Sequence, residues 1–140
     1  MHNIDHEVYL CYILKIDLVV NYFGGKPMKR EEKNQKTQRR IMDSALAEFA
    51  EKGHGGSSVN TICAAQGISK GIIYHYFENK DELYLACVEE CFQRLTAHLS
   101  AALPEEDDGS VEDQLGRYFT ARMTFFQENP VYQPIFCEAV

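Results

Sequence analysis

The feature that most constrains the fold of this chain is a pair of short helix patterns separated by a tight turn. Ser58 precedes the first pattern and Ser69 precedes the second, and serine is a preferred residue at the amino-terminal cap of a helix. Gln66, Gly67 and Ile68 lie between the patterns. Glycine readily adopts the positive φ that a sharp turn needs. Two short helices joined in this way predict a helix-turn-helix unit.

Longer helices are predicted on both sides of this unit. Apolar residues at spacings of three and four predict a helix from Thr37 to a stop at Gly53. After the unit, Asn79 is placed to cap a fourth helix that runs towards Leu99. No stretch alternates strongly enough to predict a sheet. We therefore expect an all-α fold.

Two further helices are predicted in the last third of the chain. Ser110 and Asp113 resemble a capping box for a fifth helix. The residues expected to form its inward stripe are Leu115, Phe119, Met123 and Phe126. A sixth helix is expected to begin near Asn129 and Pro130, and Pro134 should bend or restart it.

Charge is distributed unevenly along the chain, whose net charge is −7. Residues 28–80 hold nine basic and six acidic side chains, whereas residues 81–140 hold three basic and twelve acidic ones. Only the local field near a groove matters for binding nucleic acid. The basic part is therefore a candidate for contact with DNA. Its run from Lys29 to Arg40 is either a solvated tail or an arm that contacts phosphates or the minor groove.

The ends of the chain lead to expectations about its organisation. Residues 1–27 lack helix caps, and Gly24 to Met28 can be encoded by a purine-rich ribosome-binding sequence followed by a start codon. Residues 1–27 are thus either a readthrough of untranslated sequence, with synthesis starting at Met28, or a genuine extension. Residues 28–82 are expected to form the DNA-binding domain. Residues 83–140 are expected to form part of a second helical domain, truncated because the last helix has barely begun.

The second helix of the unit has a polar, exposed face by the spacing of its residues. Ile73 and Phe77 lie four positions apart and define the face that packs inward. The residues that cannot all be buried with them are Lys70, Gly71, Ile72, Tyr74, His75 and Tyr76. A helix in this position enters the major groove in helix-turn-helix proteins. These side chains are therefore candidates for contacts with bases and phosphates.

The residues from Thr37 to Gly53, then Ser58 and Val59, then Gly67 to Leu83, resemble the signature of TetR/AcrR transcriptional regulators. The resemblance covers about a third of the chain and extends through three consecutive helices. It implies an all-α fold, with a three-helix DNA-binding domain followed by the start of an α-helical effector and dimerisation domain in residues 83–140. It also implies a homodimeric repressor that binds double-stranded operator DNA and is released by a small-molecule effector. The resemblance further implies that nine residues sit at DNA-contact positions: Ser58, Ser69, Lys70, Gly71, Ile72, Tyr74, His75, Tyr76 and Lys80. The five cysteines, which are odd in number and do not predict a disulfide framework, separately favour reduced thiols and the cytoplasm.

Two residues depart from this signature. Gln66 replaces a small residue before the turn glycine, and Ile72 replaces a smaller or hydroxyl-bearing residue near the bases. The apolar Ile72 favours contact with a thymine methyl group over a hydrogen bond.

Other readings of the chain remain open. Phe119, Met123 and Phe126 are candidates to line an effector cavity, although core packing is the alternative reading. Cys87, Cys91 and His98 share a helix face, but free cysteines commonly pack as small core residues, and no metal or cofactor is expected. The alternative to a regulator is a helical protein-interaction module that does not bind DNA. No pattern of an enzyme active site is found, and no membrane span is expected.

Overall fold

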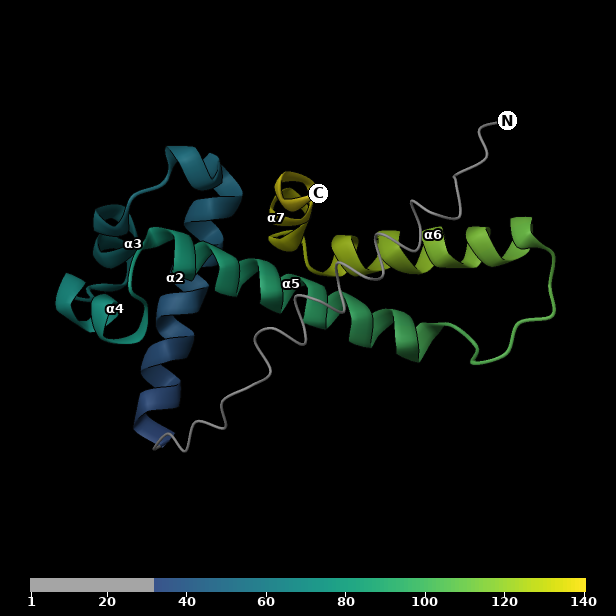
Figure 1. Cartoon of the computed structure of the whole chain (residues 1–140), viewed down its shortest axis with the longest axis horizontal. Coiled ribbons are helices and arrows are strands. Elements are labelled where there is room, and N and C mark those ends of the chain that lie inside the picture. Colours follow the sequence, from purple (N-terminus) through teal and green to yellow (C-terminus); the bar gives the residue numbers. More distant parts are fainter. Residues whose placement is uncertain (1–31) are drawn as a thin grey trace. The chain divides into compact units, whose positions relative to one another are not determined.

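The computed structural model describes residues 32–140, with side chains from residue 34 onwards, and these residues form helices and connections only (Figure 1). The helices are α2 (Glu32–Gly56), α3 (Val59–Gln66), α4 (Lys70–Tyr76), α5 (Lys80–Ala102), α6 (Val111–Glu128) and α7 (Tyr132–Ala139). The predicted all-α fold is confirmed for this part of the chain. Residues 1–27, with the hypothesis of a start at Met28, lie outside the described residues.

Polar side chains cap four of these helices as the sequence predicts. The side chains of Ser58, Ser69, Asn79 and Ser110 each accept a hydrogen bond from a backbone N–H in the first turn of the helix that follows. The hydroxyl group of Ser110 also donates to Oδ2 of Asp113 at 2.7 Å, so the two residues of the expected capping box are in contact through their side chains. These caps satisfy N–H groups that have no partner within a helix. They fix where α3, α4, α5 and α6 begin.

Helix α2 is broken near its end, where Gly53 adopts φ 70° and ψ 173°. The predicted stop at Gly53 is confirmed, but one more helical turn follows it, up to Gly56. The backbone N–H of His54 donates to both oxygens of Glu138 on α7, at 3.0 and 3.2 Å. A Cβ atom at position 53 would lie 3.3 Å from that carboxylate. Glycine is therefore required at the break both by its backbone angles and by the close approach of α7.

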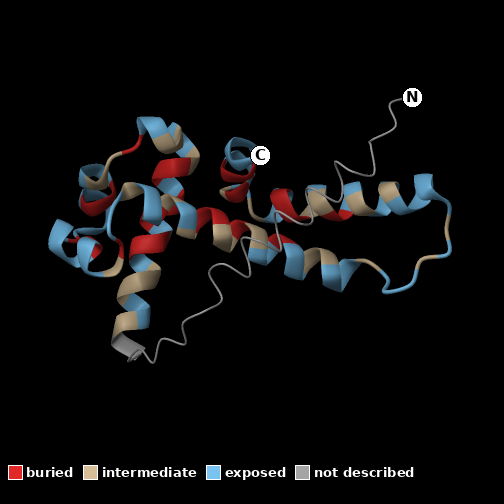
Figure 2. Ribbon diagram, viewed as in Figure 1, coloured by how far each residue is buried: buried red, intermediate tan, exposed pale blue. Residues whose placement is uncertain are grey.

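The core forms where α2 packs against α3, α5 and α7, and α5 packs against α6 and α7. Figure 2 shows the buried residues on the facing sides of these helices. Those with the least exposure include Ile41, Phe49, Ile62, Ile73, Leu83, Cys87, Cys91 and Ile135. Helix α5 runs without a break across the domain boundary predicted at residues 82 and 83. Among the described helices, none is long and apolar enough to cross a lipid bilayer.

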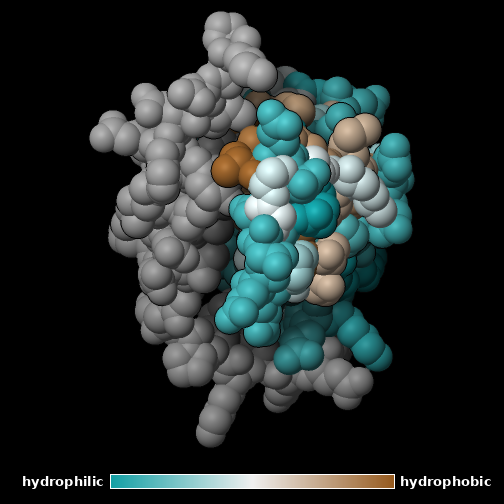
Figure 3. Space-filling view, turned by 90° about the vertical axis from the view of Figure 1, so that its right-hand side faces the viewer, coloured by the Kyte–Doolittle hydropathy of each residue, from teal (hydrophilic) through white to brown (hydrophobic). Residues whose placement is uncertain are grey.

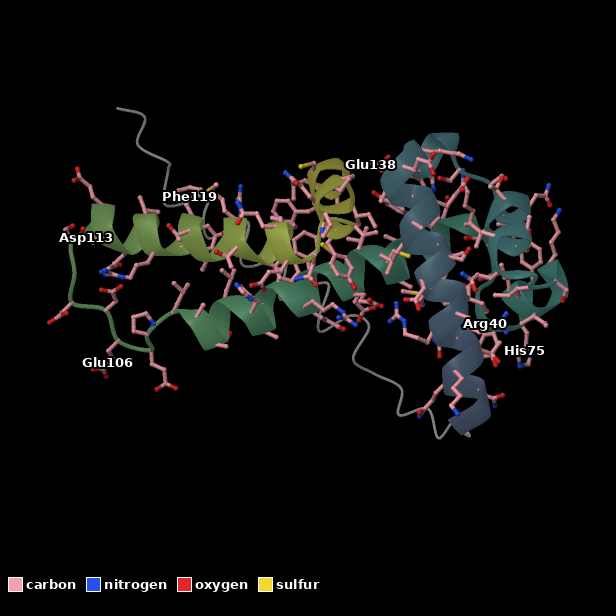
Figure 4. All side chains as sticks on the ribbon, turned by 180° about the vertical axis from the view of Figure 1, so that it is seen from behind. Arg40, His75, Glu106, Asp113, Phe119 and Glu138 are labelled. Carbon is pink, nitrogen blue, oxygen red and sulfur yellow. The ribbon has the colours of Figure 1, made fainter. Side chains whose placement is uncertain are left out.

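The inward stripe predicted for α6 was partly wrong. Phe126 is buried, but Phe119 and Met123 are 39% and 60% exposed, and the buried residues beside Phe126 are Ala121 and Phe125. In Figure 4, Phe119 projects from the side of α6 away from α5. Two apolar stripes run side by side on this helix. The aromatic residues of α7 select one of them, because Phe125 packs on Tyr132 with ring centroids 5.9 Å apart.

The effect expected of Pro134 was also wrong. Helix α7 begins at Tyr132, two residues later than predicted, so Pro134 is its third residue. An N–H in the first turn has no acceptor within the helix, and proline therefore costs no hydrogen bond there. No bend or restart is needed. The aromatic contacts of Tyr132 with α6 set this start.

The connection between α5 and α6 is a polar loop, as its sequence predicts. Glu105, Glu106 and Asp108 are exposed. Asp107 instead accepts hydrogen bonds from the guanidinium of Arg117, which ties the loop to α6. Figure 3 looks onto this end of the molecule and shows mostly hydrophilic residues. This acidic loop thus lies at the opposite end of α5 from the helix-turn-helix unit (Figure 1).

Two glycines near the turn allow a matched test of the geometry of the unit. Gly67 has φ 61° with open space around its Cβ position, whereas Gly71 lies in α4 in open space apart from Ser69 at 3.9 Å. Gly67→Ala should destabilise the fold by about 1 kcal/mol, because a left-handed conformation is unfavourable for alanine. Gly71→Ala should instead stabilise it by about 0.5 kcal/mol through helix propensity. Urea unfolding of both variants measures this, and equal effects of the two substitutions would contradict the geometry.

Candidate nucleic-acid interface

Helix α4 is held by its inner face, which leaves the other face free to bind. Ile73 and Phe77 are buried, as predicted, together with Ile68 from the turn. Burying three side chains of this size contributes several kcal/mol to the free energy of folding, by about 1.5–3 kcal/mol each. The orientation of α4 against α3 is therefore fixed by packing. The side chains on its outer face therefore point in one defined direction.

The outer face of α4 carries most of the predicted contact residues. The exposed residues are Ser69, Lys70, Gly71, Ile72, Tyr74 and His75. Ile72 and Tyr74 are 42% and 49% exposed. Figure 4 shows His75 projecting from this face, near the end of the molecule. The face thus combines an ammonium group, an apolar side chain, a phenol and an imidazole.

Tyr76 is only half-buried, and it links α4 to the beginning of α2. Its hydroxyl group donates to Oδ1 of Asn34 at 3.4 Å. Its ring lies edge-on to the ring of His75, with centroids 5.1 Å apart. Tyr76 therefore positions its neighbour His75 as well as lying beside the candidate surface. The structure brings Asn34, which the sequence did not single out, to the same place.

Ser58 and Lys80 have structural partners that the sequence did not reveal. The hydroxyl group of Ser58 lies 2.8 Å from that of Thr61. Lys80 Nζ donates to the backbone carbonyls of His54 and Ser57, at 2.8 and 3.2 Å. An ammonium group has three N–H donors, so two of those of Lys80 are already engaged. The contact of Lys80 with a phosphate stays a prediction. The third N–H donor of its ammonium group would make that contact.

Helix α2 holds the helix-turn-helix turn from the other side. Arg40 donates from Nη2 to the backbone carbonyl of Gln66 at 2.8 Å. Ser44, which is buried, donates from Oγ to the carbonyl of Ile62 at 2.8 Å. The carbonyl of Gln66 lies at the end of α3, where no intrahelical donor is left. The carbonyl of Ile62 lies one turn earlier, inside the helix. The sequence placed Arg40 in a basic run that could be an arm, and gave no signal for this role.

The neighbouring residue, Arg39, reaches in a different direction, to α5. Its Nη1 atom lies 2.7 Å from Oε2 of Glu90, whose side chain is only 15% exposed. The other oxygen of Glu90 accepts a hydrogen bond from the hydroxyl group of Tyr132 and lies 3.2 Å from Arg94. Glu90 thus connects α2, α5 and α7. Burial alone would raise the pKa of Glu90, but the bonds from Arg39 and Tyr132 hold it below its ordinary value.

The predicted effector residues are not brought together on one surface. Phe126 is part of the core, and Phe119 and Met123 face outward on α6. Arg122 lies over the rings of Phe119 and Phe136, at 5.5 and 5.4 Å from their centroids. The assignment of these residues to an effector cavity stays a prediction.

The cysteines of α5 are packed in the core. Cys87 and Cys91 are fully buried, and burial raises the pKa of both thiols, that of Cys91 to about 12. A protonated thiol is a poor metal ligand and nucleophile. His98 packs its ring near that of Phe125, with centroids 5.5 Å apart. Within residues 32–140, no group of three His, Cys, Asp or Glu side chains is arranged to hold a metal ion.

Comparisons with known proteins show what the helix-turn-helix part of the chain resembles. Residues 41–87 match the profile of "Bacterial regulatory proteins, tetR family". The chain is 38% identical over 53 residues to the negative regulator of the icaADBC biofilm operon, IcaR, of Staphylococcus epidermidis. The aligned residues cover 38% of this chain and 29% of IcaR. It is 34% identical over 91 residues to the repressor AcnR of Corynebacterium efficiens, covering 64% of this chain and 45% of AcnR.

Solved structures agree with these sequence matches. A TetR-like transcriptional regulator from Rhodococcus sp. RHA1 superposes with a TM-score of 0.62 and 26% identity, over 71% of this chain and 53% of the regulator. The fold and the exposed α4 thus define a helix-turn-helix unit like that of these regulators. Over residues 41–87, about a third of its length, the chain is similar to the TetR family. It spans less than half the length of the curated relatives described above.

The link through Glu90 predicts how stability depends on pH. A carboxyl group whose pKa is lowered by folding contributes stability above its ordinary pKa of 4.5, and this contribution is lost as the pH falls through the folded-state value. Glu90→Gln should therefore destabilise the fold at neutral pH by about 1–2 kcal/mol. The effect is no larger because its partner Arg39 is 41% exposed, and solvent screens the ion pair. The difference from the unchanged chain should shrink in acid. Urea unfolding between neutral pH and about pH 3 measures it.

The adjacent Glu89 provides the control, because burial raises its pKa instead. A group with a raised pKa stabilises the fold below its ordinary pKa and loses that contribution as the pH rises. Glu89→Gln should consequently leave stability unchanged or increase it at neutral pH. If the two substitutions shared one pH trend, the assigned role of Glu90 would be wrong.

Proposed function

We propose that this chain is a DNA-binding transcriptional repressor that contacts operator DNA through the outer face of α4. The observation that carries this proposal is the exposed set of Lys70, Ile72, Tyr74 and His75 on a helix whose opposite face is locked into the core. A helix presented in this way fits the major groove, where each base pair offers a distinct pattern of donors, acceptors and methyl groups. The similar proteins IcaR and AcnR are named as a negative regulator and a repressor, which supports repression rather than activation.

The residues of the interface divide into two roles. Lys70, with one N–H of Lys80 and the hydroxyl groups of Ser58 and Ser69, would contact phosphates and set the position of the protein. Ile72, Tyr74 and His75 would face the base edges, with Gly71 allowing close approach of the backbone. Tyr76 would hold His75 in place through its contact with Asn34. This division assigns a specific task to each of the nine residues that the resemblance implies.

A protein-interaction module without DNA binding is the alternative, and the charge distribution counts against it. Six of the nine basic residues of 28–80 lie between Lys29 and Arg40, and Lys70 and Lys80 lie on α4 and at the start of α5. The acidic excess lies in α5 to α7 and their connections. Phosphate-binding surfaces need positive charge locally, and an acidic remainder does not prevent binding. Binding to duplex DNA that weakens steeply with salt would exclude the alternative. Binding that is insensitive to salt would favour it.

Release by a small-molecule effector and assembly into a homodimer complete the proposal. Helix α5 follows the recognition helix directly and continues into the acidic part of the chain. A ligand that favours one tilt of α5 would change the separation of two recognition helices in a dimer, and half-sites tolerate spacings of about one helical turn, 34 Å, or its multiples. Such a regulator acts without catalysis and in the cytoplasm, where its DNA is.

The role of Lys70 predicts a general loss of affinity. Lys70→Ala should weaken binding to all duplexes alike and lower the slope of log affinity against log salt by about one counterion. Lys52→Ala is the control, because Lys52 pairs with Glu48 on α2 and lies outside the proposed surface. Fluorescence anisotropy with labelled duplexes over a range of salt measures both variants. An unchanged slope for Lys70→Ala would remove this residue from the interface.

The role of Ile72 predicts a change of sequence preference instead. Ile72→Ala should reduce discrimination at one base pair by about 1 kcal/mol, because an apolar contact with a thymine methyl group is lost. The measurement is affinity for the duplex that the chain selects from a random pool, compared with single-base variants of that duplex. Uniform weakening at every position would mean that Ile72 does not face a base edge.

A further inference from the structure

A groove of about 340 Å³ lies between α2 and α5, and no part of the proposed DNA interface lines it. Its walls are one stripe from each helix, with residues at steps of three and four. These residues are Gln35, Gln38, Arg39 and Met42 from α2, and Ala86, Glu89, Glu90 and Gln93 from α5. The volume is at the lower end of the range of sites that hold small organic molecules, about 300–1,000 Å³.

The groove carries one negative charge that its own residues do not neutralise. Arg39 is paired with Glu90 at 2.7 Å, so these two charges offset each other. Glu89 accepts a hydrogen bond from the amide of Gln93 at 2.9 Å. Within the described residues, no lysine, arginine or histidine forms an ion pair with Glu89. Burial without a compensating cation raises the pKa of Glu89, as expected for a carboxylate that lacks a counter-charge.

The remaining lining is suited to an amphiphilic molecule. Met42 is buried and Ala86 half-buried, and together they form an apolar surface within the groove. The three glutamine side chains add carboxamide oxygens, which accept hydrogen bonds from N–H groups. A carboxylate, amide oxygens and an apolar surface match a protonated amine attached to hydrocarbon.

We propose that the groove between α2 and α5 is a binding site for a small organic cation with a short hydrocarbon body. The ammonium or guanidinium group lies at Glu89 and the carboxamides, and the hydrocarbon covers Met42 and Ala86. An anion is excluded by Glu89, and a neutral molecule of the same shape leaves the carboxylate without a counter-charge. The site is separate from α4 and from the exposed face of α6. It stands or falls independently of DNA binding, because its test measures only ligand binding.

The test uses n-hexylammonium, with hexan-1-ol as the neutral probe and hexanoate as the anionic probe. The side-chain amide signals of Gln35, Gln38 and Gln93 in two-dimensional NMR spectra of the 140-residue chain report occupancy of the groove. Hexylammonium should give saturable shifts of these signals, with weaker binding of hexan-1-ol and none of hexanoate. Glu89→Gln should weaken hexylammonium binding about three- to fivefold, the value of a partly exposed charge pair.

Two further variants make the result decisive. Glu51→Gln removes an exposed carboxylate of α2 that does not line the groove, and should leave affinity unchanged. Ala86→Met narrows the groove and should weaken hexylammonium and hexan-1-ol alike, which tests the site even if Glu89→Gln disturbs the fold. Equal affinity for hexylammonium and hexan-1-ol, or no effect of Ala86→Met, would overturn the proposal. Unsaturable shifts spread over the acidic α5–α6 connection would do the same.

Discussion

Consecutive arginines attach α2 to two different parts of the chain, and the presentation of α4 depends on both attachments. Arg40 donates to the carbonyl of Gln66 in the helix-turn-helix turn. Arg39 pairs with Glu90 on α5, which also accepts from Tyr132 on α7. Adjacent residues on a helix point about 100° apart, so one turn of α2 serves two partners. The recognition unit is thereby joined to the acidic helices through side chains of a single short segment.

A buried ion pair does not by itself make a protein more stable than a well-packed apolar contact would. Its value here lies in geometry. The carboxylate of Glu90 has partners on three helices, and removing any one of them leaves charge or a hydroxyl group poorly satisfied at low exposure. An apolar replacement could fill the same volume while allowing α2 to slide. Glu90 therefore supports one relative placement of α2, α5 and α7 over neighbouring ones.

Much of the fold could be predicted because its signals are local. Ser58, Ser69 and Asn79 cap helices within three residues of themselves, and the positive φ of Gly67 follows from its place in a tight turn. The outer face of α4 follows from the spacing of Ile73 and Phe77. Contacts between distant residues left no such signal. The bond from Arg40 to the turn spans 26 residues, and that from Arg39 to Glu90 spans 51.

The error on α6 has the same origin, because its two apolar stripes are equivalent until α7 is placed.

The attachments of α7 also bear on how a signal could reach α4. Glu138 holds the N–H of His54 at the break in α2, and Tyr132 meets Arg39 through Glu90. Helix α7 is thus joined to α2 directly at the break, through Glu138, and indirectly at Arg39, through Glu90 on α5. A displacement of α7 must either carry α2 with it or break both contacts. Because Arg40 on α2 also donates to the carbonyl of Gln66, in the turn before α4, moving α2 would reorient the recognition helix without unfolding it.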